Sequence, residues 1–187
     1  MKILALNRPI GTPLNGVANV DIIPDSALIK DRKPFFMPDF STRWTLDVTL
    51  AYRVSRLGKN VAEKFANRYY DAMTLMLRAR PLDLIDSLGG NSSAVTTAFD
   101  GAAIMGQWMP IPENRTVVDL TINGELYEIN LEEALIDDVV ADMSRYFTLK
   151  IGDIIIAGAT PHSIEAVIDS SVTATLNGKE CLNFKVK

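Results

Sequence analysis

The sequence has one cysteine, Cys181, and one histidine, His162, among its 187 residues. One cysteine cannot form a disulfide within the chain, and one histidine excludes a metal centre built from several histidines. With so few cysteines and histidines, the chain lacks the ligands of most protein zinc sites. A metal ion bound by this chain would therefore need oxygen ligands, as Mg²⁺ does.

Basic residues and long apolar runs are also scarce. The chain has 19 Lys and Arg against 23 Asp and Glu, a formal net charge of −4. The basic residues are scattered, so we expect no nucleic-acid partner. No apolar run approaches the ~20 residues of a membrane-spanning helix, and the N-terminal apolar stretch is too short for a secretory signal. We therefore expect a cytoplasmic protein that does not contact a membrane.

The composition is that of a globular protein, with 48% hydrophobic and 22% charged residues. A chain of this length can bury a core of its own, so we expect one domain. We assign residues 1–21 to a short N-terminal strand, Lys2–Leu6, and a loop. Residues 22–187 form the expected core of the domain.

The clearest strand pattern lies at residues 45–55, where apolar and polar side chains alternate. This period of two indicates a strand with one face on a core, and it places Asp47 and Thr49 together on the other face. Side chains two apart on a strand lie about 6.6 Å apart, so a pair of carboxylates there could converge on one hard cation. Only the first of the two residues is a carboxylate.

Two stretches have the pattern of amphipathic helices. Asn60 opens a capping box, and apolar residues then recur at helical spacing, so we expect a helix that ends near Pro81. Asn130 opens a second capping box, followed by a helical stripe that runs to Phe147. We expect each helix to cover the core.

The dipeptides Asn123-Gly124 and Asn177-Gly178 each separate two strand-like runs. Asn-Gly is the strongest short signal for a tight β-hairpin, so we expect an antiparallel hairpin at each. Residues 152–156 form a short apolar strand candidate, and the small, glycine-rich residues 87–97 indicate a loop. Many strands with two covering helices predict an α+β fold that is mainly β.

The order of these pieces resembles the fumarylacetoacetate hydrolase family, over roughly residues 22–187. Each matching piece is short, and the series in the same order is what makes the resemblance specific. The matching pieces are Asp25-Ser26-Ala27-Leu28, Lys33-Pro34-Phe35-Phe36, Pro38-Asp39-Phe40-Ser41, Asp47-Val48-Thr49, Gly58-Lys59, Tyr69-Tyr70-Asp71, Ala98-Phe99-Asp100-Gly101, Asn123-Gly124-Glu125, Gly152-Asp153-Ile154-Ile155 and Phe184-Lys185-Val186-Lys187.

The resemblance implies a mixed β-sandwich roll that forms dimers. It also implies a Mg²⁺ or Mn²⁺ ion held by a glutamate-x-glutamate strand and a later aspartate. In such a site the metal binds the oxygens of a diketo or 2-oxo acid and stabilises the enolate that the reaction forms, while a lysine assists.

This chain departs from the family at those positions. The glutamate pair falls on Asp47 and Thr49, the metal aspartate on Arg78 and the lysine on Thr97. We therefore expect no metal cofactor. We expect Arg78 to pair with Asp47 instead, because an uncompensated carboxylate in an enclosed pocket costs several kcal/mol.

Three further residues belong to the expected site. In the family, a short motif follows the metal aspartate, and Asp83 matches the aspartate within that motif. Thr160 lies in a stretch that resembles the family's Thr-Gly-Thr-Pro, with one inserted residue. If Mg²⁺ or Mn²⁺ does bind, we expect Asp47 to hold it with either Asp71 or Asp83, since Mg²⁺ tolerates one or two protein carboxylates.

Three hypotheses about function follow. The first is a non-catalytic binding or structural homodimer that has lost the metal-dependent hydrolase, isomerase or decarboxylase site, with a small anionic 2-oxo acid as a candidate ligand. The alternative is an active hydrolase or decarboxylase on a diketo or 2-oxo acid with rearranged metal ligands. The third is a structural subunit that supports an active paralogue. The homodimer is also suggested by Trp44, Trp108 and Met109, which lie in segments without obvious burial.

Overall fold

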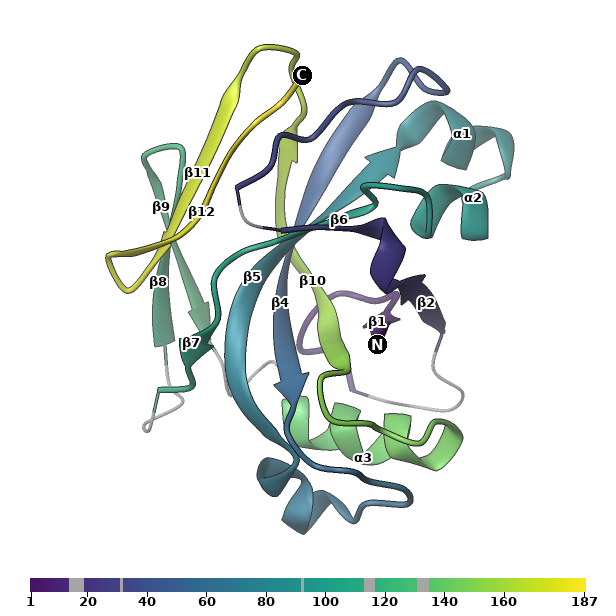
Figure 1. The fold of residues 1–187 in the computed structure, drawn as a ribbon, viewed down its shortest axis with the longest axis vertical. Coiled ribbons are helices and arrows are strands. Elements are labelled where there is room, and N and C mark those ends of the chain that lie inside the picture. Colours follow the sequence, from purple (N-terminus) through teal and green to yellow (C-terminus); the bar gives the residue numbers. More distant parts are fainter. Residues whose placement is uncertain (14–18, 31, 92, 113–116, 131–134) are drawn as a thin grey trace.

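The computed structural model describes residues 1–13, 19–30, 32–91, 93–112, 117–130 and 135–187 (Figure 1). Most of the secondary structure is β, as expected. The strands are β1 (Lys2–Leu6), β2 (Val20–Pro24), β3 (Leu28–Ile29), β4 (Trp44–Val54), β5 (Tyr70–Pro81), β6 (Ala103–Met105), β7 (Met109–Pro110), β8 (Val117–Ile122), β9 (Glu125–Asn130), β10 (Ile154–Glu165), β11 (Ser171–Leu176) and β12 (Lys179–Lys185). The helices are the 3₁₀ segments η1 (Asp25–Ala27) and η2 (Glu63–Arg68), and α1 (Leu82–Ser87), α2 (Ala94–Thr97) and α3 (Ile136–Tyr146).

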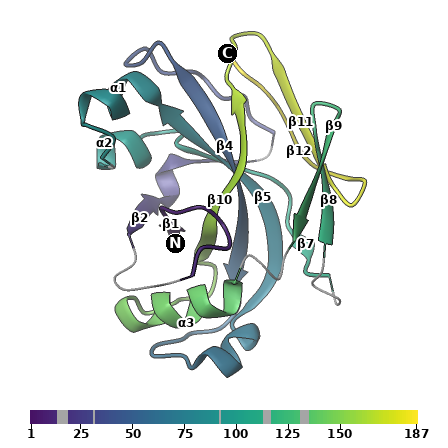
Figure 2. The ribbon, with the colours of Figure 1, turned by 180° about the vertical axis from the view of Figure 1, so that it is seen from behind.

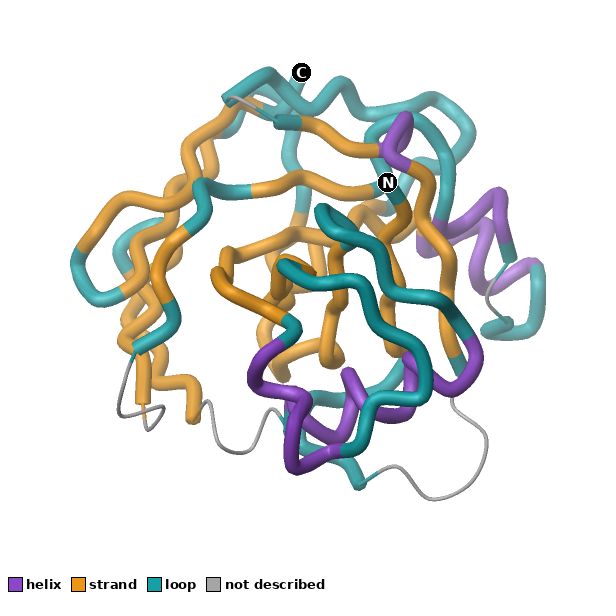
Figure 3. The backbone as a smooth tube through the Cα atoms, turned by 60° about the horizontal axis from the view of Figure 1, so that its bottom comes forward, coloured by secondary structure: helices purple, strands orange, loops and turns teal. Residues whose placement is uncertain are grey.

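The strands form two sheets. The larger has the order β2-β1-β10-β4-β5-β6-β3, with β7 paired to β5, and it curls into a half-barrel (Figure 3). The smaller has the order β12-β11-β8-β9. This arrangement confirms the expected mainly β, α+β fold class. Among the described residues, no helix is long and apolar enough to cross a membrane.

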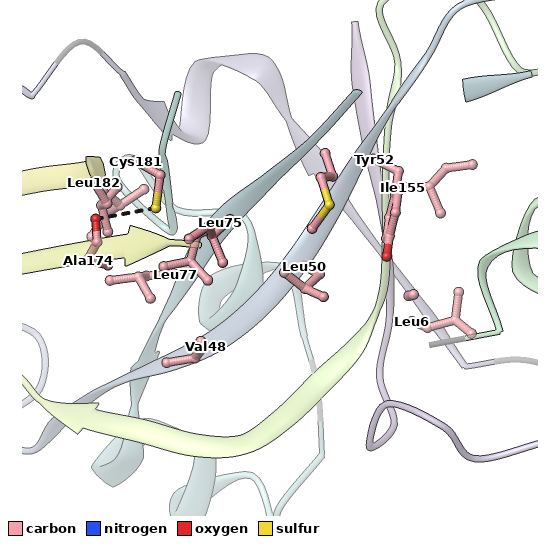
Figure 4. Close-up of a cluster of buried hydrophobic side chains, with 14 of the residues drawn as sticks. Leu6, Val48, Leu50, Tyr52, Leu75, Leu77, Ile155, Ala174, Cys181 and Leu182 are labelled. Atoms are coloured by element: carbon pink, nitrogen blue, oxygen red, sulfur yellow. Dashed lines mark hydrogen bonds between the residues drawn. The ribbon is translucent and has the colours of Figure 1, made fainter. Parts of the chain in front are cut away.

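Strands β4 and β5 form the centre of the half-barrel and are paired along their length, from Trp44 opposite Pro81 to Val54 opposite Tyr70. The strand expected at residues 45–55 is therefore confirmed as β4. Its apolar face lies in the larger core, where Val48, Leu50 and Tyr52 meet side chains of β5 and of the small sheet (Figure 4). Trp44, which we expected as a candidate for the dimer interface, is only 3% exposed and is part of this core.

The prediction of a helix between Asn60 and Pro81 is wrong. The chain turns at Asn60, which has a φ of 51°, forms only the short 3₁₀ segment η2, and then continues as the twelve-residue strand β5. All residues of β5 except Asp71 and Arg80 are buried. A strand buried on both faces is a nearly continuous apolar run without alternation, so its periodicity does not distinguish it from a buried helix.

The remaining elements agree better with expectation. Both Asn-Gly hairpins are confirmed, and all four central residues have positive φ angles between 49° and 89°. The second covering helix is confirmed as α3, but it does not begin at the expected capping box of Asn130, which is the last residue of β9. It begins at Ile136, after Leu135 with a φ of 50°, and residues 131–134 lie outside the described residues. Strand β10 is longer than the expected residues 152–156, and the expected loop at 87–97 ends in the one-turn helix α2.

The two faces of the β4–β5 pair border different clusters of buried side chains. One face belongs to the larger core, which also includes Val139, Val140 and Met143 of α3. The other face lies inside the curl. Its cluster contains Ile3, Ala5, Ile23, Ala51, Met76, Ile154 and Ile156. Asp47 and Thr49 share the face of Ala51, so they belong to the inside of the half-barrel.

Candidate functional site

The candidate site lies where Asp47 of β4 and Arg78 of β5 stand directly opposite each other on neighbouring strands. Opposite residues in an antiparallel pair project to the same face, so both side chains lie on the inner side of the half-barrel. These are the two positions where the motifs place metal ligands. The fold therefore brings the two positions together, with a carboxylate at one and a guanidinium at the other.

The ion pair of Arg78 is with Asp21 of β2, not with Asp47 as we expected. Its Nη2 donates to Asp21 Oδ2 at 2.5 Å, and the two side chains are only 5% and 7% exposed. Asp21 is 57 residues away in the sequence, and the curl of the sheet brings β2 round to face β5. Removing one partner of such a pair would leave a buried charge without compensation.

Asp47 is approached by a different arginine, Arg80. The distance from Arg80 Nε to Asp47 Oδ2 is 3.8 Å, which is too long for a hydrogen bond. Burial raises the pKa of Asp47 above its usual value, and the positive charges of Arg80 and Arg78 only partly oppose this effect. Burial likewise lowers the pKa of Arg80, with a further decrease from the charge of Arg78. Asp47 and Arg80 thus compensate each other incompletely.

The three threonines of the expected site are buried and use their hydroxyl groups locally. Thr49 Oγ1 donates to the Met76 carbonyl at 2.7 Å. Thr97 Oγ1 donates to the Ser93 carbonyl, and Thr160 Oγ1 to the Val48 carbonyl, each at 2.9 Å. These hydrogen bonds join neighbouring strands or close a turn of helix. The position of the second metal glutamate is thus fully enclosed.

The structure does not bring Asp71 or Asp83 to Asp47. Asp71 accepts two hydrogen bonds from Arg53, at 2.8 and 3.0 Å. Arg53 is six residues along β4 from Asp47, about 20 Å at ~3.3 Å per residue. Asp83 binds the loop before β4, where Arg43 Nε donates to it at 2.6 Å, and hydrogen bonds from this loop hold the pKa of Asp83 well below its usual value.

Arg43 precedes Asp47 by four residues, about 13 Å along the chain. Asp83 is therefore also remote from Asp47. Over the described part of the chain, no group of three or more Asp, Glu, His or Cys side chains is placed to hold a metal ion. At this position the described residues place Asp47 beside two arginines, Arg78 and Arg80.

A cleft of about 680 Å³ opens above the site. Its walls are Leu6 at the end of β1, residues 7–10 after it, and residues 159–161 of β10, together with Asp47, Arg78 and Arg80. Figure 2 shows the segment after β1 beside β10. Among the described residues that line the cleft are three arginines, Arg8 included, and one carboxylate, Asp47.

Sequence reasoning missed Arg8, Asp21 and Arg80. Arg78 and Arg80 are two apart, which on a strand places them on one face. This signal was hidden because residues 60–81 were interpreted as a helix. Arg8 and Asp21 lie in the N-terminal segment that we assigned to a strand and a loop, and nothing in their sequence context connects them to Asp47.

The sequence matches the model of a known protein family. Residues 16–185 match the family model "Fumarylacetoacetate (FAA) hydrolase C-terminal". Rat mitochondrial oxaloacetate tautomerase FAHD1 is 26% identical over 174 residues, which cover 88% of this chain and 78% of the relative. Oxaloacetate tautomerase YcgM of Escherichia coli K12 is 26% identical over 172 residues, covering 84% of this chain and 76% of the relative.

The fold agrees with this match. The crystal structure of fumarylpyruvate hydrolase from Pseudomonas aeruginosa, in complex with Mn²⁺ and pyruvate, superposes with a TM-score of 0.83 at 15% identity. The superposition covers 100% of this chain and 89% of that chain. The family match spans nearly the whole sequence, and the chain therefore belongs to the fumarylacetoacetate hydrolase family.

Proposed function

We propose that this chain is a non-catalytic member of its family, a homodimeric binding protein that has lost the divalent-metal site. The observation that carries the proposal is the buried Arg78 at the position of the metal aspartate, in an ion pair with Asp21. The family chemistry needs a cation at the reacting oxygens, because a metal ion stabilises the enolate by several kcal/mol. In this chain, the position that the resemblance assigns to the metal aspartate carries the guanidinium of Arg78.

Electrostatics oppose a second cation beside Arg78. Two unit charges 4 Å apart interact by about 4 kcal/mol at an effective dielectric constant of 20, and a divalent ion doubles this value to ~8 kcal/mol. Two carboxylates, Asp21 as the partner of Arg78 and Asp47, oppose that repulsion, and Arg80 adds a further positive charge. Thr49 offers no charge and is enclosed. These residues support a site that excludes Mg²⁺ and Mn²⁺.

The relatives define what has been lost under this proposal. Two of them are named as oxaloacetate tautomerases, and the P. aeruginosa enzyme was crystallised with Mn²⁺ and pyruvate. The alternative is an active enzyme with rearranged ligands, which keeps Asp47 as its one carboxylate in the cleft. A cytoplasmic location remains part of the proposal, although the rat relative is named as mitochondrial.

The test combines metal content with turnover. The purified protein is dialysed against Mn²⁺, freed of loosely bound ion and analysed for metal, and its melting temperature is measured with and without Mg²⁺ or Mn²⁺. We expect well below one ion per chain, no rise in melting temperature, and oxaloacetate tautomerisation and acylpyruvate cleavage at the rate of the solution alone. The E. coli relative, treated in parallel, shows that the assays work.

One outcome would overturn the proposal in favour of the active enzyme. It is stoichiometric metal together with metal-dependent turnover that disappears in Asp47→Asn. A matched variant, Thr49→Glu with Arg78→Asp, restores carboxylates at the two family positions. We expect this variant to bind more Mn²⁺ than the wild type when it folds, as judged by circular dichroism, because it replaces a repelling charge with ligands.

A further inference from the structure

We propose that one end of the half-barrel docks on the surface of an anionic lipid bilayer. This docking end consists of residues 55–69, which lead from β4 to β5, and residues 145–152, which include the end of α3 and the loop to β10. It lies at the bottom of Figure 1, and Figure 3 turns it toward the reader. The inference goes beyond the proposed function, because this surface lies outside the cleft above Asp47 and its argument does not depend on whether the chain is catalytic.

Hydrogen bonds hold the two segments of the docking end side by side. Gly58 and Leu149 exchange two backbone hydrogen bonds, at 3.0 and 2.8 Å, and Gly152 N donates to the Val54 carbonyl at 2.9 Å. Between these contacts the chain is three residues long on one side and two residues long on the other. The two short turns are therefore direct neighbours.

Each of these turns has an exposed aliphatic side chain. Leu57 is 64% exposed and Ile151 is 73% exposed. Gly58 lets the first turn lie close to Tyr69, since a Cβ at this glycine would come within 2.8 Å of the ring. Exposed apolar side chains that lie together on a protein surface mark a docking site. The two turns thus present adjacent apolar tips that are fixed before any partner arrives, which lowers the entropy cost of binding.

The docking end is also rich in basic residues. Its two segments contain six Lys and Arg and one acidic residue, Glu63, in a chain whose formal net charge is −4. Anionic lipids attract such side chains, and each one near the bilayer surface strengthens binding about fivefold. Apolar contact and electrostatic attraction together determine how strongly a protein binds at a bilayer surface. The six basic residues, all exposed, are Arg56, Lys59, Lys64, Arg68, Arg145 and Lys150.

Neighbouring carboxylates leave most of this positive charge uncompensated. Asp138 lies close enough to Glu63 to raise the pKa of that carboxyl, so negative charge gathers toward the start of α3, away from its basic end. Apart from Arg145, the basic residues of the docking end form no ion pair with any residue that the structure describes. The carboxylates that border the docking end in the sequence each have a basic partner: the pairs are Asp71 with Arg53, Asp142 with Arg145 and Asp153 with Lys2.

The aromatic and aliphatic residues favour a bilayer over a nucleic acid. Lys64 and Arg68 lie 5.0 and 4.9 Å from the centroid of the Phe65 ring, and Arg145 lies 5.7 Å from that of Tyr146. Binding of single-stranded nucleic acid uses open aromatic faces on which bases stack, whereas here cations occupy ring faces. Exposed aliphatic tips contribute nothing to phosphate binding, but they bury apolar surface at the boundary between headgroups and acyl chains.

This inference revises the expectation from the sequence that the chain does not contact a membrane. The two basic segments are separated in the sequence by β5 to β9 and most of α3, so their charges look scattered. Only the fold brings them to one end. Docking on the surface needs no membrane-spanning element, because the tips reach no deeper than the boundary of the acyl chains.

The test is co-sedimentation of the purified chain with vesicles of phosphatidylcholine, either alone or with about 30% phosphatidylserine, at about 0.1 M salt. We expect the partition coefficient to be at least about tenfold larger for the anionic vesicles and to fall at about 1 M salt, because salt screens the attraction. Leu57→Ser with Ile151→Ser should weaken binding about tenfold or more by removing the apolar tips. Lys64→Gln with Lys150→Gln should weaken it about 25-fold, since two charges are lost.

Matched controls lie at the other end of β4, a strand of eleven residues and about 33 Å. Phe36 and Ile168 are 70% and 58% exposed there, and Phe36→Ser with Ile168→Ser should leave binding unchanged. Lys33→Gln with Lys185→Gln is the control for lost charge, and it should also have no effect. Backbone hydrogen bonds place these controls: Phe35 N donates to the Lys185 carbonyl and Ala166 N to the Trp44 carbonyl.

A fluorescent label tests which end touches the lipid. Cys181 is 2% exposed and burial raises the pKa of its thiol to about 11, so it does not compete for a thiol reagent at neutral pH. A polarity-sensitive dye on Ile151→Cys should shift its emission to shorter wavelength when anionic vesicles are added. The same dye on Ile168→Cys should show no shift.

Several results would overturn the inference. One is no binding to anionic vesicles, or equal binding to neutral ones. Another is equal vesicle binding by the wild type and both docking-end double variants, all folded as judged by circular dichroism. A dye shift at Ile168→Cys but not at Ile151→Cys would place the contact at the wrong end. Binding of an RNA oligonucleotide or of polyglutamate without vesicle binding would assign the basic residues to a different class of partner.

Discussion

We expect loss of the buried Arg78–Asp21 ion pair to lower the free energy of unfolding. Arg78→Ala removes a guanidinium that is 5% exposed and leaves the Asp21 carboxylate, 7% exposed, without that partner. Breaking a buried pair in this way costs about 3–5 kcal/mol. Thr49→Ala removes one buried hydroxyl that donates to a backbone carbonyl, which is worth about 1–2 kcal/mol. We therefore expect Arg78→Ala to destabilise the protein more than Thr49→Ala.

The assay is urea unfolding of wild type, Arg78→Ala, Asp21→Ala and the double variant, followed by circular dichroism. If the two residues act as a pair, the double variant should lose less stability than the sum of the single variants, with a coupling energy of about 1–3 kcal/mol. Arg56→Ala controls for the loss of an exposed positive charge and should cost less than about 0.5 kcal/mol. A coupling energy near zero, or a smaller loss for Arg78→Ala than for Thr49→Ala, would refute the reasoning.

Three other predictions concern a turn, a carboxylate and the assembly. Gly124→Val should lower the melting temperature, because φ is 89° there while no atom lies within 4 Å of an added Cβ; the cost is backbone strain of about 1–2 kcal/mol, and an unchanged melting temperature would contradict the turn. The raised pKa of Asp47 means that its contribution to stability is present below about pH 3.8 and is lost as pH rises through its folded value, so Asp47→Asn should gain stability relative to wild type between pH 4 and pH 7 in urea unfolding. Equal differences at both pH values would argue against a raised pKa. Light scattering at micromolar concentration should give twice the chain mass of 20.6 kDa; a monomer mass would remove the homodimer from the proposal.

Local signals in the sequence determined several elements. Asn123-Gly124 and Asn177-Gly178 specify their hairpins because both central positions of the turn need positive φ, which this dipeptide accepts. The alternation at residues 45–55 specifies β4, since one face is on the larger core and the other carries Asp47. Helix α3 follows from its apolar stripe. In each case the information lies within a few neighbouring residues.

Tertiary structure decided the rest. Strand β5 has both faces buried, so no local period marks it, and only its pairing with β4 and β6 makes it a strand. The choice of Asp21 as the partner of Arg78 depends on the curl that brings β2 to face β5, and the placement of Arg8 depends on the approach of its loop to Gly158. Contacts between residues far apart in sequence are set by how the whole sheet closes. The residue types at the site are therefore visible in the sequence, whereas their partners are a property of the folded chain.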